Sequence, residues 1–511
     1  MRALVSVALA CTALLLVAAH PLIAGAGSST PWRILWPTFK YSMSRSGFLD
    51  VRSLYGSFHY RDFKVLWRVK TQLCISSTPA VGDLNGDGRP EVAFSSCDGH
   101  LYVVDGATGR ILWNSTTGGG FASPTIWDLD GDGKPEVVTM GASGVVYCFN
   151  GTGSEEWEVP GRFIRGSVAV ADINGDGRYE VLAPSFDGYL YVIEYNGSVV
   201  DKIRVGEYPA STPSIADING DGLPDAVLTD GPDLVVILFH GLGRHSVYHV
   251  DLGSILVGPP ALAIIGGSHP YAVVVSEDCR VFKVDLARGS IDGEARLPGA
   301  SECYSAPSIG DVDGDGMTDI VVGSMQGLYV LGWNLTVEYA FPEFKVYTSS
   351  PVIADIDGDG RNEILIGQET GEFDIVDISQ FNGEPYSEIQ WLLKTGGPIM
   401  GSAAVADVNG DGMPEILIGS RDFNLYCITG IPAPPAQPTT STSPATTSNT
   451  VATVGVPAGT HRSTQTPSPR ASGSLTPGPG GWEARVNVEI VAAAAAFAVA
   501  ASLLAYIASK R

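Results

Sequence analysis

Residues 78–94 read TPAVGDLNGDGRPEVAF, and this stretch decides the fold because it is the first copy of a repeated unit. The apolar runs at its two ends have the composition of β-strands, and the Gly-rich polar segment between them has that of a turn. Steps of 44–45 residues between successive copies indicate a repeat architecture. The pattern Asp-apolar-Asn/Asp-Gly-Asp-Gly occurs seven times, beginning at Asp83, Asp128, Asp172, Asp217, Asp311, Asp355 and Asp407.

Two longer steps fit the same repeat. The fourth step spans 94 residues and contains a copy without the acidic pattern, whose strand-like runs lie at 259–265, 271–275 and 281–284. The last step spans 52 residues because it carries additional residues at 379–388. The chain therefore contains eight copies, of which the fifth lacks the acidic loop.

Each copy contains four short strand-like runs separated by turns, which is typical of a propeller blade and not of a helical repeat. The eighth copy ends after its third run at 425–428, while the run at 65–69 resembles a fourth strand without the first three. Pairing these two runs would leave no open edge in the ring. The sequence predicts an all-β fold, an eight-bladed β-propeller of four-stranded antiparallel blades over residues 64–431. The fourth run often carries tryptophan, as at Trp113, Trp157 and Trp391.

The two ends of the chain predict export and membrane anchoring. Residues 1–26 have the basic start, apolar run and small-residue cleavage pattern of a signal peptide, and 27–63 form a lead-in. Residues 432–485 predict a disordered Ser/Thr/Pro-rich stalk. Residues 486–508 predict one transmembrane helix, followed by a cytoplasmic tail at 509–511, with a buried Ala-rich core helix as the alternative. We expect a single-pass cell-surface protein with an extracellular N-terminal domain.

The repeated loop places oxygen-bearing groups at alternating positions, which suits Ca²⁺, a hard cation that takes six to eight oxygen ligands. In the first copy these groups are Asp83, Asn85, Asp87, the carbonyl of Arg89, and Glu91. The sequence predicts about seven calcium ions with a structural role. The ligands in the other copies are Asp128, Asp130, Asp132, Glu136; Asp172, Asn174, Asp176, Glu180; Asp217, Asn219, Asp221, Asp225; Asp311, Asp313, Asp315, Asp319; Asp355, Asp357, Asp359, Glu363; and Asp407, Asn409, Asp411, Glu415.

These loops are not EF-hands, because an EF-hand needs a bidentate Glu at its twelfth position and a following helix. The alternative is a set of Asp/Asn/Gly turns that bind no metal. Of the 55 acidic residues, 24 lie in the seven loops, where the carboxylates would repel one another without cations. The formal charge of −24 argues against a nucleic-acid partner. The twelfth residues are Phe94, Thr139, Ala183, Leu228, Val322, Ile366 and Ile418.

Over residues 75–430, the loops and the four-strand pattern resemble the FG-GAP/VCBS repeats of integrin α-subunit propellers and of microbial surface proteins. Residues 36–39 and 46–47 also resemble the segment that precedes such propellers in prokaryotic proteins. The resemblance implies calcium between the first and second strands, on one face of the disc. The fifth copy departs from the family pattern, since 264–270 contain no carboxylate, and no ion is expected there.

The chain is expected to be a binding or adhesion module and not an enzyme. Residues 105–113 resemble the tryptophan-docking motif of pyrroloquinoline-quinone dehydrogenases, and some calcium-bearing propellers are polysaccharide lyases. Those two enzyme types and a purely structural spacer are the alternatives, although no distinct catalytic constellation is apparent. His240, His245, His249 and His269 lie close in sequence without the spacing of a known metal site, so a surface or core role is the alternative to metal binding.

A partner, an extracellular protein or glycan, is expected to bind the face opposite the calcium loops. Aromatic and Arg side chains suit such contacts, and packing between blades is the alternative role for each candidate. The candidates are Phe121, Arg162, Phe163, Arg165, Tyr208, Tyr304 and Tyr347.

The cysteines and glycosylation sequons follow the same register. Disulfides Cys74–Cys97 and Cys279–Cys303 are expected because these residues lie in connections on one face. Cys148 and Cys427 occupy the same third-strand position in blades two and eight, so they should be buried and unpaired. Four acceptor asparagines, of which the last three fall in exposed third-to-fourth strand turns, are Asn114, Asn150, Asn196 and Asn334.

Overall fold

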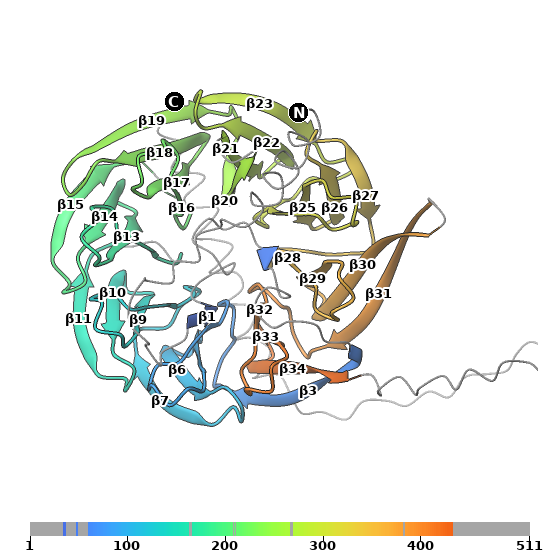
Figure 1. Ribbon diagram of the computed structural model, residues 1–511, viewed down its shortest axis with the longest axis horizontal. Coiled ribbons are helices and arrows are strands. Elements are labelled where there is room, and N and C mark those ends of the chain that lie inside the picture. The colour runs from blue at the N-terminus through green and yellow to red at the C-terminus, as the bar shows by residue number, and fades with distance from the viewer. Residues whose placement is uncertain are drawn as a thin grey trace, which may run out of the picture. The chain divides into compact units, whose positions relative to one another are not determined.

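The computed structural model describes residues 34–36, 48–49, 60–162, 166–207, 209, 211–265, 269–381 and 384–432. The described strands form eight sheets arranged around one axis, each with a core of four antiparallel strands, so the predicted propeller is confirmed (Figure 1). Blades 1 to 4, each given from the axis outward, consist of β4 (Ala80–Gly82), β5 (Glu91–Ser95), β6 (His100–Asp105) and β7 (Ile111–Thr116); β8 (Thr125–Trp127), β9 (Glu136–Met140), β10 (Val145–Phe149) and β11 (Glu155–Pro160); β12 (Ala169–Ala171), β13 (Glu180–Ser185), β14 (Tyr189–Ile193) and β15 (Val199–Arg204); and β16 (Ser214–Ala216), β17 (Asp225–Asp230), β18 (Asp233–Phe239) and β19 (His245–Asp251).

The other four blades repeat this order, and the last of them takes its outer strand from the start of the described chain. Blades 5 to 8 consist of β20 (Leu256–Ile265), β21 (His269–Ser276), β22 (Arg280–Asp285) and β23 (Ser290–Arg296); β24 (Ser308–Gly310), β25 (Asp319–Ser324), β26 (Gly327–Gly332) and β27 (Val337–Phe341); β28 (Val352–Ala354), β29 (Glu363–Gly367), β30 (Glu372–Phe381) and β31 (Glu384–Lys394); and β32 (Ala404–Ala406), β33 (Glu415–Gly419), β34 (Asn424–Pro432) and β3 (Tyr60–Lys70).

The ring closes as the sequence predicts, because β3 pairs antiparallel with β34 at the outer edge of blade 8 (Figure 1). Trp67 lies opposite Cys427 in this ladder, and Val69 lies opposite Leu425. The pairing leaves neither β3 nor β34 as an unpaired end of the ring, which would otherwise offer free backbone groups to other chains.

Two short strands that the sequence did not predict lie on the inner edges of two blades. β1 (Ile34–Trp36) pairs antiparallel with β4, and β2 (Phe48–Leu49) pairs parallel with β28. Blades 1 and 7 therefore have five strands. Leu49 is fully buried in the same apolar cluster as Val352 and Leu365, so part of the lead-in contributes to the propeller core.

The apolar cores lie between neighbouring blades, since the side chains of each sheet pack against the next sheet. One cluster joins Val138 and Val146 of blade 2 to Val170 and Val181 of blade 3. The second and third strands are buried along most of their length, while the fourth strands alternate between exposed and half-buried residues. This burial explains why the inner strands read as continuous apolar runs in the sequence.

A set of hydroxyl groups beside the first strands links successive blades. The backbone N–H of Thr78 in blade 1 donates to Ser123 Oγ of blade 2 at 2.9 Å. The backbone N–H of Ser402 in blade 8 donates to Thr78 Oγ1 at 3.0 Å, which links the last blade to the first. The same bond joins blades 2 to 3, 3 to 4, 6 to 7 and 7 to 8. Blades 5 and 6 carry Pro259 and Ala306 at this position, and neither side chain has a hydroxyl group.

Aromatic side chains on the fourth strands make a second set of bonds between blades. Trp67, Trp113 and Trp157 donate their indole N–H to carbonyls in the third-to-fourth strand turn of the next blade, at 2.8, 3.1 and 2.7 Å. Trp67 bonds to Gly106, so residues 105–113 receive the tryptophan of the preceding blade. Between blades 5 and 6 the same role falls to Lys283, whose Nζ donates to the Trp333 carbonyl at 2.9 Å.

We expect the substitution Gly151→Ala to destabilise the contact between blades 1 and 2. A Cβ at Gly151 would collide with the Leu84 carbonyl, while Trp113 donates to the Gly151 carbonyl from the same side. A backbone collision of this kind costs about 2–4 kcal/mol. Urea denaturation in the presence of calcium measures the loss, with Glu155→Gln, an exposed residue at the start of β11, as the control. A Gly151→Ala chain as stable as the control would contradict the packing described.

No helix among the described residues is long and apolar enough to cross a membrane. The predicted signal peptide, transmembrane helix at 486–508 and tail lie outside these residues, as do the stalk beyond Pro432, which ends β34, and most of the lead-in.

Candidate functional site

Each of the seven acidic loops is closed by its own first aspartate. In the first loop, Asp83 Oδ1 accepts the Gly86 N–H at 2.7 Å, and Asp83 Oδ2 accepts the Gly88 N–H at 2.9 Å. Both glycines have positive φ, 76° and 83°, which permits the tight curl. The same two bonds recur in the other six loops. The sequence therefore curls each loop around its first carboxylate.

The carboxylate at the ninth position lies beneath the loop at the start of the second strand. Glu91 Oε2 accepts the backbone N–H of Leu84 at 2.8 Å, and the equivalent bond occurs in all seven loops at 2.8–3.0 Å. All seven of these acids are buried: Glu91, Glu136, Glu180, Asp225, Asp319, Glu363 and Glu415. A buried acid of constant geometry at the base of every loop is what a cation-binding loop requires.

The loops fall into two kinds according to their third residue. In loops 1, 3, 4 and 8 this residue is asparagine. In loops 1, 3 and 8 its Nδ2 donates to the ninth-position Glu at 2.6, 3.0 and 2.7 Å, while the ninth residue of loop 4 is the shorter Asp225. In loops 2, 6 and 7 it is aspartate, which has no hydrogen to donate to that carboxylate. These three loops therefore hold four carboxylates with no amide bridge between them.

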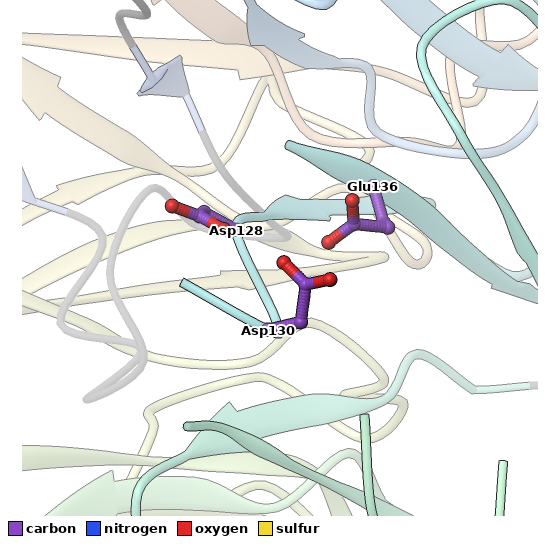
Figure 2. A group of neighbouring side chains, drawn as sticks. All are labelled: Asp128, Asp130 and Glu136. Carbon is purple, nitrogen blue, oxygen red and sulfur yellow. The ribbon is translucent and has the colours of Figure 1, made fainter. Parts of the chain in front are cut away.

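In those three loops the structure brings three carboxylates within 4.8 Å of one another. Figure 2 shows the group in loop 2, where the Asp130 carboxylate is turned toward Glu136 and Asp128 lies at the start of the loop. The groups in loops 6 and 7 are Asp311, Asp313 and Asp315, and Asp355, Asp357 and Asp359. In the other four loops the predicted ligands make the hydrogen bonds described above, but no three of their carboxylates come this close together.

Loop 7 also contains a buried oxygen that accepts no hydrogen bond. Glu363 is fully buried, its Oε2 accepts the Ile356 N–H, and its Oε1 has no hydrogen-bond partner. A buried carboxylate oxygen without a partner is costly, and a cation supplies the missing interaction. The all-oxygen donor set fits Ca²⁺ better than a transition metal, which would favour His or Cys ligands.

Burial raises the pKa of the ninth-position acids, and the loop aspartates add to the effect. The pKa of Glu91 rises to about 7, that of Glu136 to about 8 and that of Glu415 to about 8, in each case chiefly through desolvation. The pKa of Asp319 rises to about 7 for the same reason, and that of Glu363 also lies well above its usual value. Without a bound cation these groups take up protons near neutral pH.

These shifts predict that the calcium-free chain is less stable at pH 8 than at pH 5. A group whose pKa is raised on folding binds more protons in the folded state, so its contribution is complete below the unfolded pKa and is lost as pH rises through the folded value. The window therefore runs from about pH 4.5 to 8. Calcium competes with the protons, so calcium-dependent stabilisation should grow with pH. Melting curves at pH 5, 6, 7 and 8, with calcium or with chelator, give the comparison, and a chelated chain that becomes more stable toward pH 8 would contradict it.

Blade 5 has no acidic loop. The pairing of β20 with β21 extends to the last residues of the two strands, with Ile264 opposite Pro270 and Ile265 opposite His269. The predicted absence of carboxylates at this position coincides with longer strands, so backbone pairing takes the place of the loop in holding this hairpin.

Both predicted disulfides, Cys74–Cys97 and Cys279–Cys303, are present in the structure. Cys148 and Cys427 are buried and unpaired, as the blade register predicts. The sequons at Asn150, Asn196 and Asn334 lie between third and fourth strands, while Asn114 lies on β7; Asn150 is half-buried and the other three are exposed.

The candidates for a binding face are only partly described. Arg162 and Phe121 are exposed, while Tyr304 and Tyr347 are half-buried and pack edge to face at a centroid distance of 5.2 Å. Tyr304 and Tyr347 therefore contribute to packing between blades 6 and 7. Phe163, Arg165 and Tyr208 lie outside the described residues.

The histidines do not form a common site. His240, His245 and His249 each face a different aspartate, at 3.5, 3.2 and 3.5 Å. Within the part of the chain that the structure describes, no group suited to a metal contains a histidine. His245 and His249 lie on β19, His240 lies in the turn before it, and His269 lies on β21 of blade 5.

The model of one protein family, described as the FG-GAP-like repeat, matches residues 83–139, 128–183, 172–228, 311–366 and 355–418. Each match runs from one acidic loop to the second strand of the following blade that bears such a loop. The chain is an FG-GAP-repeat propeller. Residues 229–310, which include blade 5, lie outside the matches. No curated protein sequence matches this FG-GAP propeller.

Solved structures similar to this FG-GAP propeller show its fold alone, because the identities are low. The biofilm matrix protein Bap1 of V. cholerae has a TM-score of 0.56 and 14% identity, covering 74% of this chain and 91% of that one. The quinohemoprotein alcohol dehydrogenase of Comamonas testosteroni has a TM-score of 0.53 and 11% identity, covering 78% and 82%. The quinohemoprotein alcohol dehydrogenase ADHIIG of Pseudomonas putida HK5 has the same TM-score and identity, covering 79% and 82%.

Proposed function

We propose that this FG-GAP propeller is an extracellular binding module whose blades are held in place by structural calcium ions. The observation that carries the proposal is the repeated loop, in which a buried ninth-position acid lies beneath two or three further carboxylates. In loop 7, Asp355, Asp357, Asp359 and Glu363 would hold the ion, and a fully buried oxygen there has no other partner. Bound calcium would neutralise the loop and fix the hairpin between the first and second strands.

The contacts of the loops support a structural role for the ions. The carbonyl of Leu84 in loop 1 packs against Gly151 of blade 2, and the carbonyl of Val408 in loop 8 packs against Gly106 of blade 1. Asn362 of loop 7 donates to the Asp311 carbonyl of loop 6 at 2.7 Å. An ion that fixes one loop thus also fixes its contact with a neighbouring blade.

The fold does not choose between binding and catalysis, since similar propellers occur in a biofilm matrix protein and in alcohol dehydrogenases. Binding is favoured over catalysis because the carboxylates that converge all belong to the repeated loops, where the proposed calcium ions give them a structural role. We infer a single-pass cell-surface protein with the propeller outside, anchored by residues 486–508, with an extracellular protein or glycan as partner. This location rests on the sequence of the chain ends.

An array of extracellular proteins and glycans, probed with the purified calcium-loaded chain, tests the proposed function. A binding module should give a ligand whose binding is lost when chelation unfolds the propeller. Failure to bind any member, together with strong stabilisation by calcium, would favour the structural spacer. Turnover of an alcohol with added quinone, or cleavage of a polysaccharide, would favour an enzyme.

A further inference from the structure

The face opposite the acidic loops has two unlike halves. It is built from the segments that lead into each first strand and from the turns between second and third strands. Among the described residues, four large apolar side chains are exposed on it, and all four belong to blades 8, 1, 2 and 3: Leu73 (46%), Phe121 (39%), Phe186 (51%) and Phe423 (37%). The remaining exposed large apolar side chains lie on outer strands or on the acidic-loop face. We call these four residues the apolar half-face.

Phe423 occupies a position where folding favours glycine. The equivalent turn residue is glycine with positive φ in blades 1, 2, 3 and 7, namely Gly99, Gly144, Gly188 and Gly371. Blade 5 has Cys279 there, which forms a disulfide. Phe423 has φ 75° and makes no such covalent link, yet its ring is exposed. A bulky residue with positive φ is strained, and strain that the fold does not require indicates a functional use.

Hydrogen bonds fix the backbone at three of these four residues. Thr71 joins two of them, since its N–H donates to the Phe423 carbonyl at 2.8 Å and its hydroxyl donates to the Leu73 carbonyl at 2.7 Å. Phe186 donates its N–H to the Arg162 carbonyl at 2.9 Å. An apolar surface supported in this way is already ordered, which lowers the entropic cost of binding.

The charges also differ between the two halves. The turns of the apolar half-face contain Asp98, Asp187 and Asp422, and each of these carboxylates accepts a tyrosine hydroxyl at 2.6–2.8 Å. Two cations accompany the phenylalanines. The Arg162 carbonyl accepts the Phe186 N–H, and Arg421 precedes Phe423 by two residues in the sequence. The described turns and lead-in segments of blades 8, 1, 2 and 3 thus carry three acids and two cations, whereas those of blades 4 to 7 carry six acids and one cation, Lys345, and are the more acidic half. The six acids are Glu207, Glu277, Asp278, Glu302, Glu343 and Glu369.

We propose that the apolar half-face binds a polypeptide segment of a partner protein that carries apolar side chains flanked by carboxylates. This inference rests on the proposed function and names its partner chemistry. The apolar side chains of the segment would cover Phe423, Leu73, Phe121 and Phe186, and its carboxylates would meet Arg162, since Arg421 already interacts with Glu369 of blade 7. The acidic half of the same face repels such a segment, which fixes where it binds.

A protein segment suits this surface better than a glycan. Sugar hydroxyls need Asp, Asn or Glu side chains with accessible, free hydrogen-bonding capacity. Both oxygens of Asp98 and of Asp422 already accept hydrogen bonds, and the unpartnered Oδ1 of Asp187 is buried. Leu73 offers no ring for a sugar to stack on, while exposed Phe and Leu together match the apolar centre of a protein interface.

Selection of displayed random peptides on the immobilised, calcium-loaded full chain tests the proposal. We expect the selected peptides to combine aromatic or aliphatic residues with Asp or Glu. Phe423→Gly restores the residue found in the other blades, so it should keep or raise the melting temperature while weakening peptide binding by about tenfold or more. Arg162→Glu should weaken binding similarly, and Ile111→Ser on an outer strand, where Ile111 is 41% exposed, should leave it unchanged.

Peptides that bind the Phe423→Gly chain as tightly as the wild type, or a selection that enriches no such peptides, would overturn the proposal. So would a glycan as the only ligand lost in this variant, or a dimer of the chain that the variant abolishes. A ligand found on the array that binds the variant unchanged would leave the binding module intact and place its site elsewhere. The failure of this inference is thereby separable from the failure of the proposed function.

Discussion

Chelation of calcium at pH 7.4 is expected to lower the melting temperature of the chain by tens of degrees. A ligand present at 100 times its dissociation constant stabilises the folded state by about 2.7 kcal/mol per site, so seven sites contribute on the order of 10–20 kcal/mol. Net domain stability is only about 5–15 kcal/mol, so ions bound at these sites would decide whether the propeller stays folded. Differential scanning calorimetry with EGTA and then with excess calcium measures the loss and its reversal.

The calcium effect should divide among the loops in a recognisable way. Asp359→Asn removes the fifth-position carboxylate of loop 7, where an unpartnered buried oxygen of Glu363 lies, and this position is aspartate in all seven loops. The variant should therefore lower the calcium content by about one ion per chain. Glu302→Gln, on the opposite face, is the matched control and should change neither ion content nor melting. A melting temperature that is the same with and without chelator would show that these loops are metal-free turns.

A chain that begins at residue 71 is expected to lose its folded monomeric state, because it lacks β3. The truncation leaves β34 as an unpaired edge over its whole length and removes Trp67, which donates to Gly106 of blade 1. An open edge of this length pairs readily with other chains, so oligomers or precipitate should replace the monomer in size-exclusion chromatography. A peptide of residues 60–70 added during refolding should restore part of the monomer.

The matched control begins at residue 60, so it keeps β3 but lacks β1 and β2. It should remain monomeric and melt at a lower temperature, since Leu49 leaves the core cluster that it shares with Val352. Trp67→Phe keeps the strand and removes one hydrogen bond, at a cost of about 1 kcal/mol. If the chain that begins at residue 71 were monomeric with an unchanged melting temperature, ring closure by β3 would be wrong.

The sequence predicts the propeller well because its period is carried by residues that the turns require. Asp83 and Gly86 recur at fixed spacing since each loop needs both a carboxylate that accepts N–H groups and a glycine with positive φ. The position of β3 is also predictable, because a single strand without partners and a blade with three strands complement each other. The disulfides follow from the same register.

Other features depend on three-dimensional contacts that no short pattern encodes. β1 and β2 are too short for a periodic signal, and only their pairing with β4 and β28 makes them strands. The repeated Thr78, Ser123 and Ser167 do recur at blade spacing, but their hydrogen bonds to neighbouring blades emerge only from the ring. The exposure of Phe186 and Phe423 is likewise invisible in the sequence, since most of the described phenylalanines are buried. Comparing Phe423 with the glycines at its repeat position would have singled it out.

The pairing of β3 with β34 has a mechanical consequence. Tension applied through residue 432 would enter the ring at the end of β34, where Pro432 lies opposite Tyr60. The pull would act along the ladder, so the hydrogen bonds between the two strands would share the load and would not open one after another. Blade 8, which carries Phe423, is also the blade through which such a force would pass. A propeller tethered at residue 432 would therefore resist pulling through the same β3–β34 ladder that closes the ring.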